Sequence, residues 1–331
     1  MFGAGAIGGF IGGMLANAGH EVTLIGRPRL RDAIAEGGLS VRPLSGTTYR
    51  LERSRISVTE DAEALADHDA VLVTVKSRDT RTAGQTLAPV IATSTKVVSF
   101  QNGVGNAATL RAAMPDHRVL AGMVSFNVRW EDGAAFHQAT SGPLALDPGA
   151  PRVAAALRET GLKVIEHDDM PGVQWGKLLL NLNNAINALC GLPLAQQLRD
   201  RRFRRVMAAT IDEGIAACRA GEIAPRGLGL LQPTLAPTVL RLPTPLFSLA
   251  ARPMLRVAPD ARSSMWEDLE RGRPTEIAEL NGEVVRLGAR TSTPTPVNAH
   301  LVARIEAATK AGRGSPGLSA DALWPASSRD A

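Results

Sequence analysis

The stretch FGAGAIGGFIGGMLANAGHEVTLIGR, residues 2–27, joins a glycine-rich turn to an apolar helix pattern and a short apolar strand pattern. Its glycines Gly3, Gly5 and Gly8 have the spacing G-x-G-x-x-G and stand where the helix opens. In a strand–turn–helix–strand unit of about 30 residues, glycines at this spacing let the backbone approach a pyrophosphate at the helix N-terminus. A tight turn without a ligand is the alternative. The second strand, at residues 21–26, favours the dinucleotide-binding interpretation.

Only Met1 and Phe2 precede these glycines, which is too few residues for the central first strand of such a unit. Families of this kind have several more apolar residues there. We therefore expect the natural chain to begin several residues earlier, with a valine codon read as an alternative start appearing here as Met1. In-frame apolar codons upstream in the genomic DNA would support this expectation, and their absence would contradict it.

The first half of the chain alternates strand and helix patterns. Its predicted strands are apolar runs that end in turn-forming or polar residues: 69–77, 96–103, 119–128 and 142–147. Two helix patterns accompany them, at residues 60–67 and 80–91. Continuous apolar runs are typical of buried parallel strands. The pattern predicts an α/β fold, a Rossmann-like doubly wound parallel sheet, in an NADP-binding domain over residues 1–168.

The second half changes to helix-period segments with glycine or proline stops. They are the segments at 172–191, 202–221, 263–272 and 275–292. These patterns predict an all-helical substrate and catalytic domain over residues 169–331. Between residues 225 and 259 lie seven prolines in an apolar, poorly periodic stretch, which predicts an excursion with short helices. It could cover a site, contact a partner subunit, or do neither.

The composition narrows the class of protein. A length of 331 residues suits two domains, and two cysteines cannot form a disulfide framework, so a reducing cytoplasm fits. The six histidines show no metal-ligand spacing, so we expect no metal site. The apolar first twenty residues lack a basic region, and no run of about 18 apolar residues exists, so we expect no targeting peptide and no membrane span.

The formal net charge of +5 suits an anionic ligand, with nucleic acid as the competing explanation. The densest basic run is RDRRFRRVM, residues 199–207. Its arginines spread around a helix, and aromatic residues make up only 4% of the chain, so no stacking platform accompanies it. We interpret this run as a solvated helix and expect no nucleic-acid partner.

The segment GKLLLNLNNAIN, residues 176–187, is an apolar helix pattern that carries four asparagines, although asparagine is a mediocre helix former. At ~100° per residue, Lys177, Asn181 and Asn184 fall on one helix face. Asn187 lies near the margin of that face, and the fourth asparagine, at position 183, points elsewhere. Such a stripe is either a solvated face or the wall of a site for a polar ligand.

The lysine in this stripe is unusual for this chain, which has 5 lysines and 32 arginines. Arginine does not release a proton in proteins, whereas the surroundings of a lysine can tune it to do so. The choice of Lys177 is therefore suggestive of acid–base chemistry.

Basic and amide side chains follow the predicted strands. Arg27 comes directly after the second strand, with Arg29 and Arg31 close by, where an NAD enzyme would carry an acidic residue for the ribose. A guanidinium there suits a 2′-phosphate and favours NADP over NAD, the alternative being an exposed loop charge. Lys76 and Asn102 end two later strands, at the edge where open parallel sheets bind ligands. A solvated lysine and a turn-forming Asn-Gly pair are the alternatives there.

Over about residues 1–310, the chain resembles the ketopantoate reductase (2-dehydropantoate 2-reductase) family. The resemblance rests on GAGAIG (3–8), Arg27, VK (75–76), QNG (101–103), WGKLLLN (175–181) and SSMWEDLERGRPTEIAELNG (263–282). That family joins an N-terminal Rossmann domain to a helical C-terminal domain. The resemblance implies NADPH-dependent reduction of 2-dehydropantoate to (R)-pantoate, a step towards pantothenate and coenzyme A, in the cleft between the domains.

The resemblance also assigns the cofactor contacts. They are Gly3, Ala4, Gly5, Ala6, Ile7 and Gly8 for the pyrophosphate, Arg27 for the 2′-phosphate, Lys76 and Asn102 for the ribose and nicotinamide end, and Glu276 near the nicotinamide ribose and Lys177.

On the substrate side, the resemblance implies Lys177 as the general acid and Asn181, Asn184 and Ser264 as substrate ligands. The family commonly has its second asparagine eight residues after the lysine, where this chain has Ala185. We choose Asn184 because it lies on the better helix face. A further asparagine that some members carry near residues 191–194 is absent.

Two alternatives remain at this point. One is a paralogous NADPH-dependent reductase of another small 2-oxo acid, which the altered asparagine pattern keeps open. The other is a non-catalytic NADPH-binding regulator, which is disfavoured because Lys177, Ser264 and Glu276 are all present. In every case we expect a small-molecule ligand, a cytoplasmic location and no membrane partner, and we consider a homodimer without deciding the oligomeric state.

Overall fold

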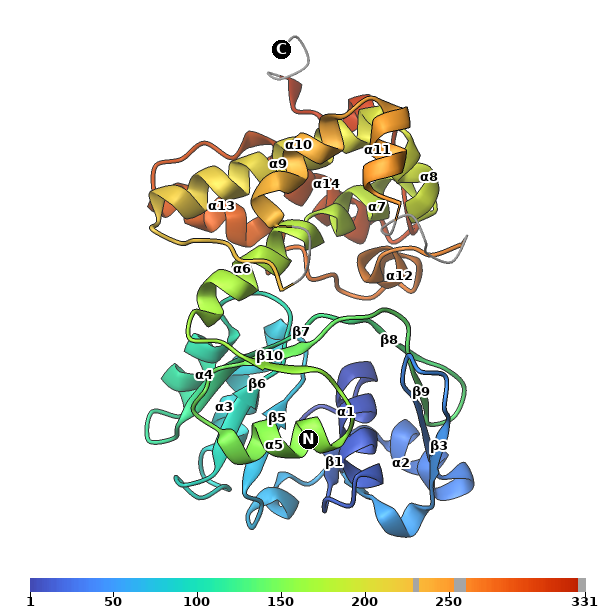
Figure 1. Ribbon diagram of the computed structural model, residues 1–331, viewed down its shortest axis with the longest axis vertical. Helices are drawn as coiled ribbons and strands as arrows, with labels where there is room; N and C mark the ends of the chain where they lie inside the picture. Colours follow the sequence, from blue (N-terminus) through green and yellow to red (C-terminus); the bar gives the residue numbers. More distant parts are fainter. Residues whose placement is uncertain (229–231, 253–259, 327–331) are drawn as a thin grey trace. The chain divides into compact units, whose positions relative to one another are not determined.

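The computed structural model describes residues 1–228, 232–252 and 260–326. The chain divides into two compact units, Met1–Met170 and Pro171–Ala331. The first unit contains sheets flanked by helices, and the described residues of the second form helices and loops alone (Figure 1). The predicted fold class, a Rossmann-like α/β part followed by an all-helical part, is confirmed. The separate roles assigned to the two parts stay predictions.

The main sheet of the first unit has the order β4-β1, then Phe2, then β5-β6-β7-β10-β11. Its strands are β1 (Thr23–Ile25), β4 (Ser57–Thr59), β5 (Ala70–Val73), β6 (Lys96–Ser99), β7 (Val119–Val124), β10 (Leu144–Leu146) and β11 (Val164–Glu166). Phe2 forms parallel bridges to Ile25 on one side and Val73 on the other. A single residue therefore occupies the position of the central first strand.

The sheet departs from the predicted pattern at one edge. β10 pairs with β7 in the antiparallel direction and with β11 in the parallel direction, so the sheet is mixed there. Antiparallel neighbours can be joined by ordinary loops, and the chain between β7 and β10 makes such an excursion without a crossover helix. The strand predicted at 119–128 accordingly ends at Val124.

The helix predicted at 60–67 is wrong. The chain forms only a short 3-10 helix there, η2 (Ala62–Leu65), and the Asp61 side chain accepts a hydrogen bond from the backbone N–H of Glu63. Leu65 is its one buried residue, so the segment lacks the apolar face that would stabilise a longer helix. The helix predicted at 80–91 is α3 (Thr80–Leu87).

A second, four-stranded sheet was not predicted. It has the order β3-β2-β9-β8 and consists of β2 (Leu39–Arg42), β3 (Tyr49–Leu51), β8 (Val128–Trp130) and β9 (Ala135–Gln138). Its strands have three or four residues each, and β2 pairs in parallel with β9 from a distant part of the chain. Strands this short carry too little periodicity to be recognised, and the long-range pairing is a tertiary event.

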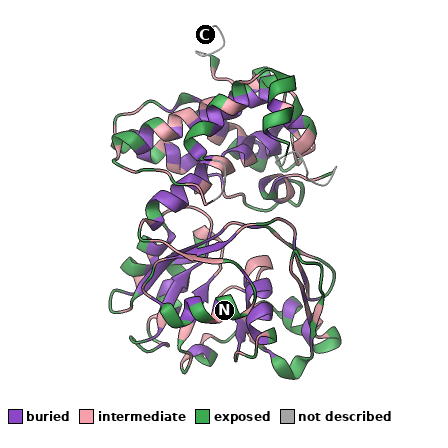
Figure 2. Cartoon of the chain, viewed as in Figure 1, coloured by how far each residue is buried: buried purple, intermediate pink, exposed green. Residues whose placement is uncertain are grey.

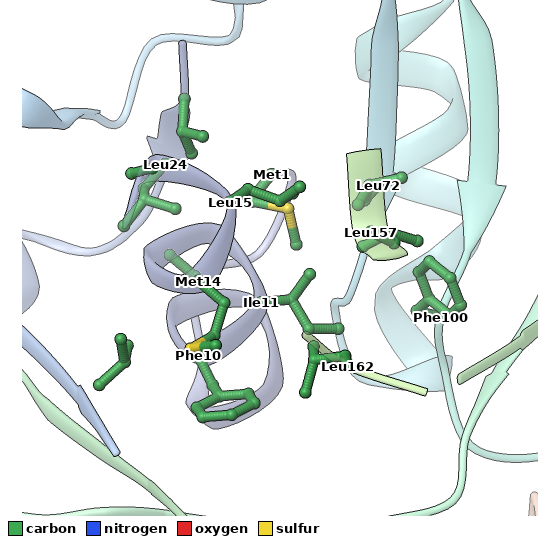
Figure 3. Close-up of a cluster of buried hydrophobic side chains, with 14 of the residues drawn as sticks. Met1, Phe10, Ile11, Met14, Leu15, Leu24, Leu72, Phe100, Leu157 and Leu162 are labelled. Carbon is green, nitrogen blue, oxygen red and sulfur yellow. The ribbon is translucent and has the colours of Figure 1, made fainter. Parts of the chain in front are cut away.

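Helix α1 (Ala6–Asn17) packs against strands of both sheets. The first unit also contains α2 (Pro28–Gly37), α4 (Asn106–Ala113) and α5 (Pro151–Glu159). From α1, Phe10, Ile11 and Met14 enter the apolar core, where Leu72 and Leu157 from β5 and α5 lie on the same side as Ile11 (Figure 3). Within the first unit, many of the buried residues lie on α1 and the main sheet (Figure 2).

Two glycines let α1 approach the second sheet. A Cβ atom on Gly9 would lie 2.6 Å from Cε1 of Phe136, and one on Gly13 would lie 2.6 Å from Cδ2 of Leu39. Both distances are far below van der Waals contact, so a side chain at either position would push the helix away from the sheet. Gly9 and Gly13 are four residues apart and therefore share one helix face.

The second unit is built around α9 (Arg201–Ala220) (Figure 1). Its other helices are α6 (Met170–Asn181), α7 (Asn183–Cys190), α8 (Leu194–Arg199), α10 (Ala236–Arg241), α11 (Thr244–Ala250), α12 (Ser264–Glu270), α13 (Asn281–Arg290) and α14 (Pro296–Ala311). α10, α13, α14, α8 and α7 all contact α9. The prediction of short helices between residues 225 and 259 is confirmed by α10 and α11. Residues 229–231 and 253–259 of that stretch lie outside the described residues.

The interpretation of residues 199–207 as a solvated helix is wrong at Arg204, which is completely buried. Its guanidinium donates hydrogen bonds to the carbonyl oxygens of Leu240 and Leu242, at 3.0 and 2.9 Å, and lies 4.2 Å from the centre of the Phe247 ring. It also bonds to the carbonyls of Leu198 and Arg199. Arg204 therefore attaches α10 and α11 to α9, and its charge is satisfied by carbonyl oxygens rather than by water.

Replacing Gly9 with alanine should lower the free energy of unfolding by about 1–3 kcal/mol, because the new methyl group would overlap Phe136. Gly37→Ala is the matched control, since a Cβ at the end of α2 meets nothing within 4 Å. Helix propensity alone predicts that both changes stabilise, by up to about 1 kcal/mol. Denaturant unfolding of the two variants separates the effects, and equal behaviour would contradict the packing argument.

Candidate functional site

The glycine turn has the geometry that its spacing predicts. Gly3 has a φ of +102°, which favours glycine. A Cβ atom on Gly8 would lie 2.5 Å from the carbonyl oxygen of Gly3 and 2.6 Å from Oγ1 of Thr74, so only glycine permits this approach of helix and turn. A Cβ atom on Gly5 would meet nothing within 4 Å. The surroundings of Gly5 are therefore open, with Ala6 and Ile7 in the next turn partly exposed.

The N-terminus of α1 has free hydrogen-bonding capacity. Gly5 is the N-cap residue and supplies no side-chain bond to the first turn. The first N–H groups of any α-helix lack partners within the helix, and the macrodipole places partial positive charge there. An anion such as a pyrophosphate is the ligand that this arrangement fits.

Of the three arginines after β1, Arg27 is the one whose guanidinium makes no hydrogen bond, ion pair or ring contact with other described residues. It is exposed, at the N-cap position of α2. Arg29 lies over the ring of Trp130, 5.6 Å from its centre, and Arg31 pairs with Asp32 at 3.0 Å. Arg27 is thus available to an anion at the end of β1.

Lys76 and Asn102 follow the parallel strands β5 and β6, and both are partly exposed. Because Phe2, β1, β5 and β6 are parallel neighbours, the glycine turn, Arg27, Lys76 and Asn102 all lie at the carboxyl edge of this sheet. The first unit therefore brings its predicted cofactor residues to one edge.

A buried polar network beneath this edge was missed by the sequence analysis. The Asn102 carbonyl accepts hydrogen bonds from Oγ of Ser77, at 2.9 Å, and from Nδ2 of Asn106, at 2.5 Å. Gln101 donates to the carbonyl of Val75 at 3.0 Å. The network ties the end of β6 to the end of β5 and holds the backbone at Asn102. QNG in the sequence is the available signal for it, but only a cofactor contact and a turn are considered for this motif in the sequence analysis.

In the second unit, the predicted stripe is the open side of an otherwise buried segment. Lys177, Leu180, Asn181 and Asn184 are partly exposed, whereas the other residues from 176 to 190 are buried. The single predicted helix is divided at Leu182 into α6 and α7. Leu182 keeps a helical conformation, and its N–H donates to the carbonyl of Leu178 at 3.1 Å, so the stripe continues across the break.

The four asparagines of this segment fall into two pairs. Asn181 and Asn184 lie on the open stripe, whereas Asn183 and Asn187 are buried and hydrogen-bonded inside the unit. Asn187, predicted near the margin of that helix face, has no exposed surface and therefore does not belong to the open stripe. A buried amide needs partners, and the surrounding loops supply them.

The close packing of the chain around Gly176 explains why the WGK motif has a glycine. A Cβ atom there would overlap the carbonyl oxygen of Arg226, whose N–H donates to the carbonyl of Gly172 at 2.9 Å. The chain at Arg226 thus lies against α6 beside Lys177. These contacts join residues 50 and 54 positions apart, and the local pattern of the sequence does not indicate them.

Lys177 has an altered acidity. Burial lowers the pKa of its amine from 10.5 to about 8, and the Glu276 carboxylate opposes this shift. Because the pKa is lower in the folded than in the unfolded chain, Lys177 destabilises the fold below about pH 8, and the free energy of unfolding rises from there towards pH 10.5. Such a cost at a single lysine is typical of functional sites.

Ser264 begins α12, and Glu276 follows that helix. Glu276 stands in the turn before α13, which begins at Asn281 and not at the predicted residue 275. Ser264 is exposed as the first residue of α12, and the neighbouring Ser263 bonds to the Asn184 carbonyl at 3.1 Å. The second unit thus brings Lys177 near Glu276, and Asn184 near Ser264.

Within the described ranges, no cluster of three or more histidine, cysteine, aspartate or glutamate side chains could hold a metal ion. The same residues include no helix with the length and apolarity needed to cross a bilayer.

Two family models match the chain: Ketopantoate reductase PanE/ApbA over residues 1–151, and Ketopantoate reductase PanE/ApbA C terminal over residues 169–309. The chain belongs to the ketopantoate reductase family. The resemblance inferred from the motifs is confirmed. As a member of this NAD(P)-dependent family, the protein is an oxidoreductase that acts on CH–OH groups.

Relatives named 2-dehydropantoate 2-reductase span nearly the whole chain. The chain is 30% identical to the one from Halobacterium salinarum over 89% of this chain and 93% of the relative. It is 28% identical to the one from Archaeoglobus fulgidus over 91% and 94%. A solved PanE/ApbA family ketopantoate reductase from Ralstonia eutropha has a TM-score of 0.80 at 33% identity, covering 94% of this chain and 98% of that chain.

A D-mandelate dehydrogenase solved with NADH and anilino(oxo)acetate is similar in fold, with a TM-score of 0.78 at 21% identity over 94% of this chain and 97% of that chain. The ketopantoate reductase fold thus also occurs in a protein with a different named substrate.

Replacing Glu276 with glutamine should lower the pKa of Lys177 below about 8, because the carboxylate that opposes the burial effect is removed. The side-chain ¹⁵N signal of Lys177 can be followed in a pH titration, which is practicable because the chain has only 5 lysines. Glu222→Gln, at an exposed position of the same unit, is the control. An unchanged or higher pKa in Glu276→Gln would contradict the placement of this carboxylate beside Lys177.

Proposed function

We propose that the protein catalyses the NADPH-dependent reduction of 2-dehydropantoate to (R)-pantoate. The proposal rests on one observation: the amine of Lys177 has a pKa of about 8, and Lys177 shares the open stripe with Asn181 and Asn184. A group that gives up a proton near neutral pH is what the reaction requires, and neutral amides can hold the small polar acid without adding charge.

The lysine has two roles in this proposal. When bound, NADPH would supply the hydride for the ketone carbon, and the carbonyl oxygen would then carry the negative charge. The Lys177 ammonium donates a hydrogen bond to that oxygen, stabilises its charge and transfers a proton to it, which gives the alcohol. Asn181, Asn184 and Ser264 hold the hydroxyl and carboxylate groups of the substrate. Glu276 keeps the lysine protonated near neutral pH and contacts the nicotinamide ribose.

In the first unit we assign the cofactor to the carboxyl edge of the main sheet. Residues 3–8 bind the pyrophosphate at the N-terminus of α1, and Lys76 and Asn102 contact the ribose and nicotinamide end. The open space at Gly5 supports this assignment. Hydride transfer requires the nicotinamide to reach the substrate that Lys177 protonates. Cytoplasmic action is part of the proposal, and the free, buried cysteines Cys190 and Cys218 are compatible with it.

The second candidate is the same reaction on another small 2-oxo acid. Ala185 occupies the position where the family commonly has an asparagine, and it is completely buried. Asn184 lies on the open stripe and can take over the role, but its side chain leaves the helix one residue earlier. Initial rates with NADPH and a panel of 2-oxo acids decide between the candidates, since 2-dehydropantoate should have the highest kcat/KM.

Arg27→Asp should raise the KM for NADPH by about tenfold to a hundredfold while changing the KM for NADH little. The change removes one charge-assisted contact, worth on the order of 1.5–3 kcal/mol, and puts a carboxylate beside the 2′-phosphate. Arg31→Asp makes the same charge change at a residue that already pairs with Asp32, and it should have a much smaller effect. A wild-type preference for NADH would show that the assignment of Arg27 is wrong.

Lys177→Ala should lower kcat by roughly 10²–10⁴ and leave NADPH binding intact, because the proton donor is lost while the pyrophosphate site lies in the other unit. Lys177→Arg should stay severely impaired, since arginine keeps the charge but does not donate a proton near neutral pH. In the wild type, kcat should fall as the pH rises through about 8, where the lysine loses its proton.

Lys310→Ala, at an exposed position of α14, is the matched control for the lysine variants and should keep wild-type kcat. If folded Lys177→Ala reduced 2-dehydropantoate at nearly the wild-type kcat, the stripe would be a solvated helix face and the acid would have to be another residue.

A further inference from the structure

Three buried amides form a connected chain inside the second unit. Nδ2 of Asn187 donates to Oε1 of Gln197 at 2.9 Å, and Nε2 of Gln197 donates to Oδ1 of Asn183 at 2.6 Å. Asn187 and Gln197 have no exposed surface, and Asn183 is 7% exposed. We call Asn183, Asn187 and Gln197 the amide network. None of these residues lies on the open stripe of α6 and α7.

Backbone partners determine how the amide of Asn187 is oriented. Its Nδ2 also faces the carbonyl oxygen of Leu192 at 2.9 Å, which can only accept, and its Oδ1 faces the backbone N–H of Ser263 at 2.8 Å, which can only donate. A flipped amide would lose both bonds. The orientation of Gln197 follows from that of Asn187, so the whole network has one hydrogen-bonding arrangement.

The network reaches the substrate residues through Ser263. This serine is attached to α7 at two points: its N–H donates to Asn187, and its Oγ donates to the carbonyl of Asn184 at 3.1 Å. Ser263 also caps α12, because its Oγ accepts from the N–H of Trp266 at 3.2 Å. Two attachments one helical turn apart determine both the position and the direction of the chain that enters α12. Ser264 is the next residue.

We propose that Asn187 is a positioning residue for substrate binding. By holding Ser263 against α7, it sets the place of Ser264 relative to Asn184, the two side chains assigned to the same substrate. This role rests on the function proposed above. In this proposal the amide network positions α12 in addition to stabilising the core. Among the described bonds, Asn187 is the member of the network that is hydrogen-bonded to Ser263. Asn183 belongs to the same network but has no described bond to Ser263.

Asn183→Ala is therefore the matched control for Asn187→Ala. Both remove a buried amide from α7 and from the same network, so both should lower the midpoint of thermal unfolding. Other bonds keep the segment before α12 attached in either variant: Arg262 donates to the carbonyl of Gly191 at 3.1 Å, and Leu194 donates to the carbonyl of Ala261 at 2.9 Å.

The decisive measurement is the KM for 2-dehydropantoate at saturating NADPH. Asn187→Ala should raise it by about tenfold, equivalent to roughly one hydrogen bond to the substrate, with the KM for NADPH unchanged. Its kcat should change much less, since Lys177 lies on α6. Asn183→Ala should leave the KM for 2-dehydropantoate near the wild-type value. An equal rise in both variants, or none in Asn187→Ala, overturns the positioning role.

Asn187→Asp provides a second test that does not depend on the stability of the alanine variant. A carboxylate keeps the acceptor for the Ser263 N–H but loses the donors to Leu192 and Gln197. Its KM for 2-dehydropantoate should lie closer to wild type than that of Asn187→Ala, even if it unfolds at a lower temperature. A KM that follows the unfolding midpoint across all three variants contradicts the proposal. Absence of turnover of any 2-oxo acid by the wild-type protein contradicts the proposed function itself.

Discussion

The first unit depends on the close approach of α1 to two sheets at once. A helix with ordinary side chains packs at 8–10 Å from its neighbours, but glycines remove the atoms that would keep α1 at that distance. Gly8 meets the glycine turn, and Gly9 and Gly13 meet the second sheet at Phe136 and Leu39. The same approach aligns the N-terminus of α1 with the carboxyl edge of the main sheet. The packing of α1 and the proposed binding of an anion at its N-terminus therefore both depend on glycines of this one stretch.

In the second unit the constraint is different, because polar side chains lie in helices that are mainly apolar. These side chains are accommodated in two ways. Arg204, Asn183 and Asn187 are buried and satisfied by carbonyls and amides, which makes them part of the core. Lys177 has a pKa of about 8, because burial destabilises its charged form more than the Glu276 carboxylate stabilises it. In this unit, burial of a hydrogen-bonded amide or guanidinium therefore contributes to the core, whereas burial of the lysine changes its acidity.

The chemistry of the family is compatible with a chain that is divided into two units. An oxidoreductase of this class has to add a hydride and a proton to one carbonyl group, and the two come from different sources. The residues that we propose for the cofactor lie at a sheet edge of one unit, and the proposed acid and substrate amides lie on helices of the other. The buried amide network then gives the helical unit a defined geometry around Asn184 and Ser264, although neither residue belongs to the network.

The sequence by itself determined the fold class, the glycine turn and the stripe at Lys177, because each is written in local spacing: G-x-G-x-x-G, strand–helix alternation and a period of 3.6 residues. It did not determine the second sheet, the burial of Arg204 or the separation of the asparagines into open and buried pairs. Those depend on contacts between distant residues, such as Ser40 with Ala135 and Asn187 with Ser263. Spacing shows which residues share a face, but only the tertiary structure decides whether that face meets water, a ligand site or another part of the chain.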